Sequence, residues 1–191
     1  MAIDIENHRA SIHRRLEVFK TALNELELEL TDQLNIDSQE FRTAEQISKV
    51  LTKITNHQTP VIYRLAVEDQ LKKKALIQSF KLFKIENRKE TKATGQLNLS
   101  RFNDTNSSTL YLGSKMKSPR TRINQHLGNG YFRTYSLHLN KWDINVQYSL
   151  QLNIYKLKTN IPEQYKRNFV ELVEQELWEK YQPIFGKKSG V

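Results

Sequence analysis

Cysteine is absent from the 191-residue sequence, and glycine (6) and proline (4) are scarce. Without cysteine the chain can form no disulfide, no thiol nucleophile and no zinc or iron–sulfur site held by thiolates. No G-x-G-x-x-G, Walker or H-E-x-x-H motif is present, and the few glycines argue against a nucleotide cofactor. The absence of cysteine fits a cytoplasmic protein, which is the location we expect.

Long hydrophobic runs are also missing. The mean hydropathy is −0.67, and no apolar run approaches the roughly 20 residues that a membrane-spanning helix needs. The stretch from Met1 to Glu6 has no basic region followed by an apolar one, so a secretory signal is not expected. We therefore expect no membrane as a partner.

The net charge of +9 is unevenly distributed. Residues 1–58 carry 7 basic and 10 acidic side chains, whereas residues 59–191 carry 23 and 11. A basic globular part of this kind favours nucleic acid as a partner first and an anionic membrane surface second. The plain alternative is a soluble basic protein with no polyanionic partner.

Hydrophobic periodicity predicts the helices and strands. Residues 4–34 are predicted as one helix, in preference to a strand at the alternating leucines and glutamates of 26–30. A polar break at 35–41 and a second helix, opened by a capping box at Thr43 and Gln46, follow. The later predictions are strands at 61–67, 109–114 and within 142–157, and helices at 69–86, 119–127, from 134–139 and at 162–181. Residues 87–108 are predicted as a mobile loop with room for a short strand at 97–99.

This order of elements predicts an α/β or α+β fold with a small central three-stranded antiparallel sheet flanked by helices. Residues 1–58 are expected to form an N-terminal helical extension. Residues 59–191 are expected to form the core, interrupted by a basic insertion at about 68–108.

Two separated stretches resemble the halves of the motif that defines the GIY-YIG nucleases. Tyr111-Leu112-Gly113 stands where that family has Tyr-Ile-Gly, and Arg122 and His126 stand on the helix that follows. Val61-Ile62-Tyr63 resembles the Gly-Ile-Tyr half, with valine in place of glycine. The resemblance covers about residues 59–186 and implies a nuclease core of that type, with an insertion between the half-motifs.

A late helix completes the resemblance. The stretch from Glu174 to Trp178, followed by Pro183, is similar to the family's helix that carries a metal-binding glutamate. Glu176 is the rival ligand if the register is shifted by two residues. Gly186 stands where the family often has asparagine.

The resemblance implies a role for each of these residues. Tyr63 or Tyr111 relays the proton, and Arg122, which can clamp phosphate oxygens bidentately, grips the scissile phosphate. His126 assists. The remaining implied roles are Glu174 as the ligand of one divalent ion, Mg or Mn, and Gly113 as a residue that lets the backbone pass close to the site.

Basic side chains suggest where DNA is contacted. Residues 114–142 contain six lysines and arginines and no acid, with aromatic residues between them, and a lysine run opens the insertion. Such positions can neutralise phosphates. The predicted DNA-binding residues are Lys72, Lys73, Lys74, Lys115, Lys117 and Arg120.

The function expected from these observations is a metal-dependent DNA endonuclease, with a restriction-type enzyme as the favoured subtype. Because a duplex cutter with one site per subunit needs two subunits or two events, a homodimer is a reasonable assembly. The alternatives are a non-catalytic nucleic-acid-binding protein on the same scaffold and a repair or mobile-element nuclease.

Overall fold

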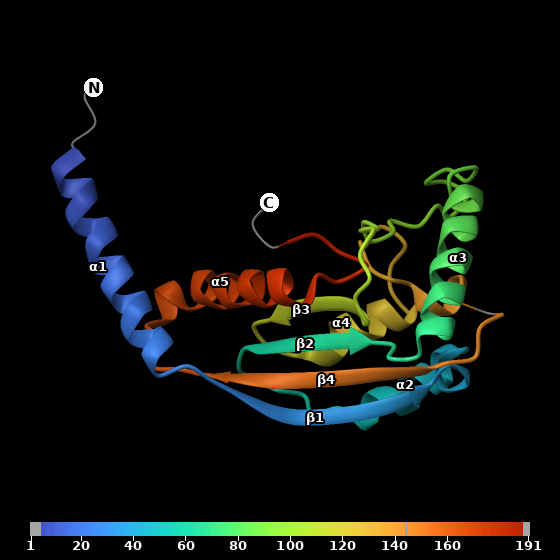
Figure 1. Cartoon of the computed structure of the whole chain (residues 1–191), viewed down its shortest axis with the longest axis horizontal. Helices are drawn as coiled ribbons and strands as arrows, with labels where there is room; N and C mark the ends of the chain where they lie inside the picture. The colour runs from blue at the N-terminus through green and yellow to red at the C-terminus, as the bar shows by residue number, and fades with distance from the viewer. Residues whose placement is uncertain (1–4, 144, 189–191) are drawn as a thin grey trace.

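The computed structural model describes residues 5–143 and 145–188 (Figure 1). These described residues form an α+β fold of five α-helices and one four-stranded sheet, with two short 3-10 helices at Ser38–Phe41 and Leu139–Lys141. Across the described residues, none of the helices combines the length and apolar character that crossing a bilayer needs. The elements in chain order are α1 (Ile5–Asn24), β1 (Glu27–Asp37), α2 (Ala44–Thr52), β2 (Val61–Ala66), α3 (Gln70–Asn87), β3 (Thr109–Lys115), α4 (Pro119–Leu127), β4 (Ser149–Lys158) and α5 (Glu163–Tyr181).

The sheet has four strands in the order β1-β4-β2-β3, and all of its pairings are antiparallel. The prediction of three strands was therefore wrong. The additional strand is β1, which pairs with β4 along its whole length with one irregularity between Leu30 and Asp32. It comes from the segment assigned to an N-terminal helical extension, so residues 1–58 contribute to the sheet of the core.

The predicted helix over 4–34 ends at Asn24 instead. The alternation of leucine and glutamate that follows is a strand pattern, and pairing with β4 satisfies its backbone groups. The predicted polar break at 35–41 is correspondingly short, because β1 runs on to Asp37. At 97–99 the structure has an isolated bridge between Leu99 and Ser136 in place of a strand, and the helix predicted from 134–139 is reduced to one 3-10 turn.

The remaining helices begin and end close to the predicted residues because their capping residues can be recognised in the sequence. The Thr43 hydroxyl accepts from the Gln46 N–H and opens α2, as predicted. Pro119 lies in the first turn of α4, and Gly128, with φ of 115°, ends that helix. The segments predicted as strands at 61–67 and 109–114 are β2 and β3.

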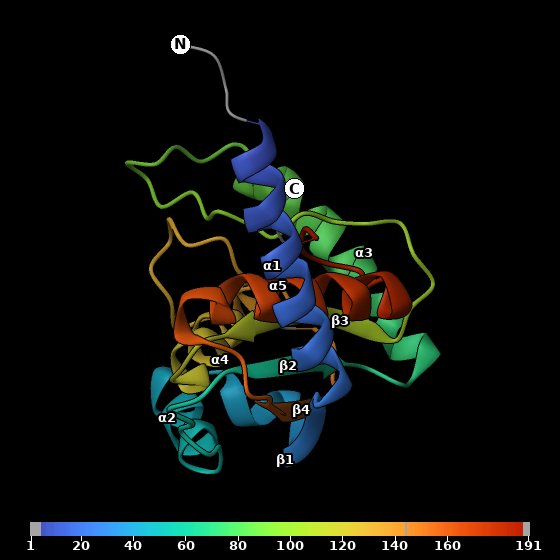
Figure 2. The ribbon, with the colours of Figure 1, turned by 90° about the vertical axis from the view of Figure 1, so that its left-hand side faces the viewer.

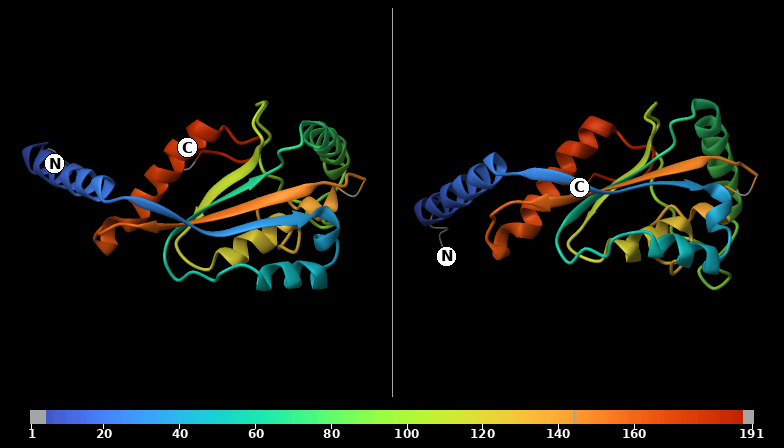
Figure 3. Two further views of the ribbon diagram at one scale, coloured as in Figure 1. Left: turned by 60° about the horizontal axis from the view of Figure 1, so that its bottom comes forward. Right: turned by 90° about the horizontal axis from the view of Figure 1, so that it is seen from below.

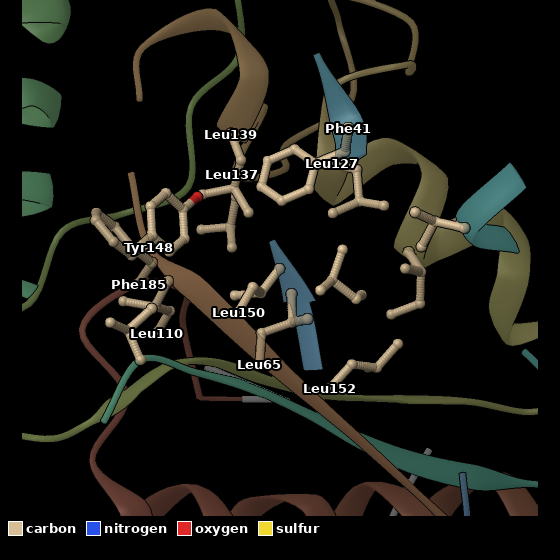
Figure 4. Close-up of a cluster of buried hydrophobic side chains, with 14 of the residues drawn as sticks. Phe41, Leu65, Leu110, Leu127, Leu137, Leu139, Tyr148, Leu150, Leu152 and Phe185 are labelled. Carbon is tan, nitrogen blue, oxygen red and sulfur yellow. The ribbon is translucent and has the colours of Figure 1, made fainter. Parts of the chain in front are cut away.

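Helices cover both faces of the sheet (Figures 2 and 3). On one face α2 and α4 pack on the inward side chains of β2 and β4, in a core that Figure 4 shows in part. On the other face α5 packs through Phe169, Val170 and Val173 on Ile62 and Leu112. Because side chains alternate along a strand, β2 and β3 supply both cores. Strand β3 forms one edge of the sheet.

Candidate active site at the edge of the sheet

Tyr63 and Gly113 are directly paired across β2 and β3. A Cβ on Gly113 would lie 2.6 Å from the hydroxyl oxygen of Tyr63 and 3.0 Å from the Tyr111 ring, closer than a real Cβ can approach. Glycine at this position therefore leaves the space that the Tyr63 hydroxyl fills. This is a more specific role than the close approach of backbone that the sequence predicted.

The two predicted tyrosines lie side by side on the α4 face of the sheet. The Tyr63 and Tyr111 rings are stacked, with centroids 6.1 Å apart and planes 9° apart. Tyr63 is buried, with 1% of its surface exposed. Burial raises the pKa of Tyr63 well above its usual range, Tyr111 adds to the shift and the Arg122 charge opposes it. Tyr63 is therefore a neutral phenol in the folded protein.

His126 is fixed in one tautomer by the backbone. The N–H of Leu137 donates to Nδ1 of His126 over 3.3 Å, and Nε2 lies 3.2 Å from the Tyr63 hydroxyl oxygen. Burial lowers the pKa of His126 well below its usual range, and the nearby Arg122 charge lowers it further. A neutral imidazole that accepts at Nδ1 carries its proton on Nε2. His126 therefore donates to Tyr63.

The Arg122 guanidinium lies beside Tyr111, at the edge of the cluster formed by Tyr63, Tyr111 and His126. It donates to the Tyr111 hydroxyl over 3.3 Å, to the side-chain oxygen of Gln125 over 2.9 Å and to the backbone oxygen of Tyr135 over 2.7 Å. Burial opposes its charge, but interactions with Tyr63 and Tyr111 raise the pKa of Arg122 overall. The side chain is thus a permanent cation held in place by three acceptors.

Glu174 reaches the same place from the opposite face of the sheet. Ser114 follows Gly113 on β3 and points to the α5 side, where its hydroxyl donates to the Glu174 carboxylate. Burial raises the pKa of Glu174, and the hydrogen bonds from Ser114 offset part of that rise. The side chain is partly buried, whereas the rival Glu176 is exposed.

A single cleft brings the two faces together. It has a volume of about 520 Å³ and is lined by Tyr111, Arg122 and Glu174. The two faces can share it because β3 is an edge strand. Tyr63 and His126 lie behind the wall formed by Tyr111, whose ring centroid is 4.2 Å from that of His126.

The donor set suits a hard divalent cation bound jointly with substrate. Within the described ranges, no group of three histidine, aspartate or glutamate side chains is placed to hold a metal ion. Among the described residues that line the cleft, Glu174 is the one with a carboxylate. Mg²⁺ is commonly held by one or two carboxylates together with waters and substrate phosphates, so the residues present fit such an ion.

Several cleft residues escaped prediction from the sequence. Tyr135 supplies the carbonyl that holds Arg122, and Ser114 fixes Glu174. The signal for Ser114 was available, since it follows Gly113 directly. The basic rim was not marked by any motif; it consists of Arg101 from the insertion together with Lys187 and Lys188.

The C-terminal segment closes one side of the cleft. The N–H groups of Ile184 and Phe185 donate to the carbonyls of Thr109 and Leu110, 2.9 and 2.8 Å away. Gly186 has φ of 111°, and a Cβ there would lie 3.0 Å from the Tyr111 ring. Glycine at the position where asparagine was expected thus allows the segment to pack against Tyr111.

The predicted DNA-binding residues have different surroundings. Lys115 and Lys117 are exposed and line a second cleft of about 470 Å³, which shares Glu174 with the first. Arg120 is partly buried, and its Nε donates to the Ile54 carbonyl over 2.7 Å. It is therefore already engaged within the fold.

The lysine run on α3 divides into two kinds of residue. Lys72 and Lys74 are exposed. Lys73 is 2% exposed, and its ammonium donates to the backbone and side-chain oxygens of Asn106, 3.0 and 3.2 Å away. Its assignment to DNA binding does not fit this position, because a buried lysine that anchors a loop cannot reach a phosphate.

Comparisons of the chain with protein-family models, with curated proteins and with solved structures found no match.

Proposed function

We propose that this protein is a divalent-metal-dependent DNA endonuclease of the GIY-YIG type. The observation that carries the proposal is the meeting of Tyr111, Arg122 and Glu174 in one cleft. Arg122 is 11 residues after Tyr111 and Glu174 is 52 residues after Arg122, and the three come from opposite faces of the sheet. Hydrolysis of a phosphodiester needs a cation for the phosphoryl oxygens, a proton acceptor for water and stabilisation of the leaving oxygen. The cleft holds a candidate for each.

Arg122 is the candidate for the phosphate contact. Three acceptors already orient its guanidinium, so little side-chain freedom is lost when a phosphate binds. Exposed cations at the rim, Arg101 and Lys187, extend the positive surface along the cleft. A DNA backbone can therefore be attracted along a path that passes Arg122.

Of the two tyrosines, Tyr111 is the one that meets the cleft. Because Arg122 donates to the Tyr111 oxygen, the Tyr111 proton points away from Arg122 and can be exchanged with a group in the cleft. We assign proton transfer from the attacking water to Tyr111. As water attacks phosphorus, Tyr111 relays the proton: its oxygen accepts a proton from the attacking water while its own hydroxyl proton passes to solvent in the cleft. The bond from phosphorus to the leaving strand breaks, and the leaving oxygen takes a proton from solvent.

Tyr63 and His126 support Tyr111 from behind. The stacked ring of Tyr63 fixes the Tyr111 plane, and the hydrogen bond from His126 fixes Tyr63. On the other side of β3, Ser114 orients the Glu174 carboxylate. A divalent ion held by Glu174 would supply charge neutralisation at the phosphate and at the leaving oxygen.

The experiment is cleavage of supercoiled plasmid with Mg²⁺, Mn²⁺ or chelator present. We expect nicked and linear products only with metal. Glu174→Ala should reduce cleavage at least about 100-fold, as expected for loss of a main electrostatic contact, while retaining DNA binding. Glu176→Ala is the matched control, two residues along the same helix and exposed, and should stay active. Full activity of Glu174→Ala would overturn the assignment.

The same experiment distinguishes the endonuclease from the alternative, a non-catalytic nucleic-acid-binding protein. The raised pKa of Glu174 favours that alternative, because burial disfavours the charged form that would bind a metal. It predicts DNA binding without metal-dependent cleavage in the wild-type protein, and equal behaviour of the Glu174 and Glu176 variants.

Within the endonuclease proposal we favour a restriction-type enzyme. Its support is that exposed lysines beside the cleft and on α3 offer DNA contacts within the same chain. Discrete fragments from linear DNA, the same in every preparation, are the expected result. Cleavage only of branched or damaged DNA would instead indicate a repair or mobile-element nuclease.

A further inference from the structure

Helix α1 leaves the body of the protein at one end and extends beyond the sheet (Figures 1 and 3). Its last turns are anchored. The Phe19 ring packs edge-on against Tyr165 and Phe169 of α5, with centroids 6.2 and 5.7 Å apart, and Ala22 is buried. From Ile5 to Glu17, every residue whose side chain the structure describes is exposed. Tertiary packing therefore supports only one half of a 20-residue helix.

An apolar stripe runs along the solvent-exposed side of α1, from the unsupported half into the anchored last turns. Steps of seven, four and seven residues place its members within about 40° of one another around a helix of 3.6 residues per turn. Spacing of this kind is the seam of a two-stranded coiled coil. The four side chains and their exposed fractions are Ile5 (54%), Ile12 (58%), Leu16 (56%) and Leu23 (57%).

We propose that α1 pairs with α1 of a second copy of this chain in an antiparallel two-stranded coiled coil. With the two helices centred on Arg14, Ile5 faces Leu23 of the second copy and Ile12 faces its Leu16. The two-fold symmetry repeats both pairs. All four members of the stripe are then covered by one another, and Arg9 faces Phe19 of the second copy.

The charges that flank the stripe select this orientation. In the same register Glu6 lies beside Lys20 of the second copy, and the symmetry makes two such pairs. Both side chains are exposed, and the ion pairs that the structure shows for them lie within their own surface helix: Glu6 with Arg9 over 2.8 Å, and Lys20 with Glu17 over 3.9 Å. These contacts are exposed ion pairs of small energy.

The other flank also favours the antiparallel arrangement. In the antiparallel pair, Arg15 would lie beside Arg15 of the second copy. The two guanidiniums do not meet, because each is turned to the body of its own chain and lies 5.6 Å from the Tyr165 ring centroid. In a parallel pair, Arg15 would lie beside Lys20 of the second copy, so that two positive charges meet. Glu6 would then lie far from Lys20 of the second copy. The charges therefore match in one orientation and repel in the other.

The test is the molar mass of the full-length protein in solution, measured by sedimentation equilibrium up to about 100 μM. We expect a dimer with a dissociation constant on the order of micromolar, because a short interface has to offset the loss of rotational freedom. Ile12→Lys with Leu16→Lys should make the protein monomeric. Leu71→Lys, at a leucine that is 77% exposed on α3, is the control and should leave the dimer unchanged.

Charge exchange tests the orientation. Glu6→Lys or Lys20→Glu alone should weaken the dimer several-fold, and the two together should restore it, since only the antiparallel register brings these positions together. A monomeric wild-type protein, or a dimer that survives the Ile12 and Leu16 changes, would overturn the proposal. Failure of the double exchange to restore association would overturn the antiparallel register. None of these readouts depends on DNA cleavage.

Discussion

The ring of His126 donates a hydrogen bond to the hydroxyl of Tyr63 over 3.2 Å, and both side chains are buried. A backbone N–H holds the opposite nitrogen of the imidazole. The direction of the bond is therefore set by the fold before any substrate arrives, and four consequences of this arrangement and its surroundings can be measured.

Stability should fall in mild acid because of His126. Its pKa is lowered in the folded state, so below about pH 6.5 the unfolded chain binds a proton that the folded chain does not. Stability contributed by the neutral ring is thus present above that pH and is lost as the pH falls, by up to about 1.4 kcal/mol per pH unit. Urea unfolding between pH 7.5 and 5 measures this loss.

His126→Gln should flatten that pH dependence without removing it, because burial also lowers the pKa of His138. Unchanged steepness in the His126→Gln protein would show that the imidazole takes up its proton as readily in the folded state as in the unfolded chain, contrary to the lowered pKa.

The two tyrosines should respond differently to loss of the hydroxyl. Tyr111→Phe should lower the single-turnover cleavage rate by about 100-fold or more, the size expected for a proton acceptor. Tyr63→Phe should lower it by about tenfold, since that residue acts through Tyr111. DNA affinity should remain within about twofold in both, because the arginine and lysine contacts are retained. If Tyr63→Phe lowered the cleavage rate more than Tyr111→Phe does, Tyr63 would be the residue that transfers the proton and Tyr111 the one that supports it.

Gly113→Ala should destabilise the protein by about 1–3 kcal/mol, the usual cost of overpacking a filled space. The new methyl would displace the Tyr63 hydroxyl, 2.6 Å away. Thermal unfolding measures the change. In a Tyr63→Phe background the same substitution should cost less, because the nearest atom has gone; equal costs in both backgrounds would show that the Tyr63 hydroxyl is not the atom displaced.

The three adjacent lysines of α3 should separate into two classes. Lys72→Gln with Lys74→Gln should weaken DNA binding and reduce the slope of log affinity against log salt by about two, with stability unchanged. Lys73→Gln should instead cost about 1–3 kcal/mol of stability, because the Asn106 oxygens lose their donor. Titration of labelled DNA at several salt concentrations and urea unfolding measure the two effects. An unchanged slope in the double variant would place α3 away from DNA.

Much of the core was predictable because its signals are local. Thr43, Pro119 and Gly128 are residues whose backbone preferences act within one turn, and each ends or begins a helix as expected. The candidate site could be predicted because the short stretches around Tyr111, Arg122 and Glu174 each resemble part of a family motif. Their meeting in one cleft depends on β3 being an edge strand, which no spacing shows.

The errors came from non-local pairing. The alternation at Leu26, Leu28 and Leu30 indicates a strand only if a partner is known, and the partner, β4, lies more than 100 residues later. Lys73 is another example: adjacent lysines look alike in the sequence, and only the position of Asn106, which belongs to the loop before β3, distinguishes one of them.

The hydrogen bonds from Ile184 and Phe185 to β3 also bear on how the protein avoids aggregation. An uncovered edge strand offers its free carbonyl and amide groups to any other extended chain. Here Ile184 and Phe185 occupy that edge beside Thr109 and Leu110, and among the described residues the backbone hydrogen bonds from this segment to β3 do not extend to Gly113 or Ser114. The same edge is thus sealed against strand addition at one end and left open for a ligand at the other. Weakening the hydrogen bonds of Ile184 and Phe185 to β3 would therefore widen access to the cleft and at the same time expose an edge that promotes aggregation.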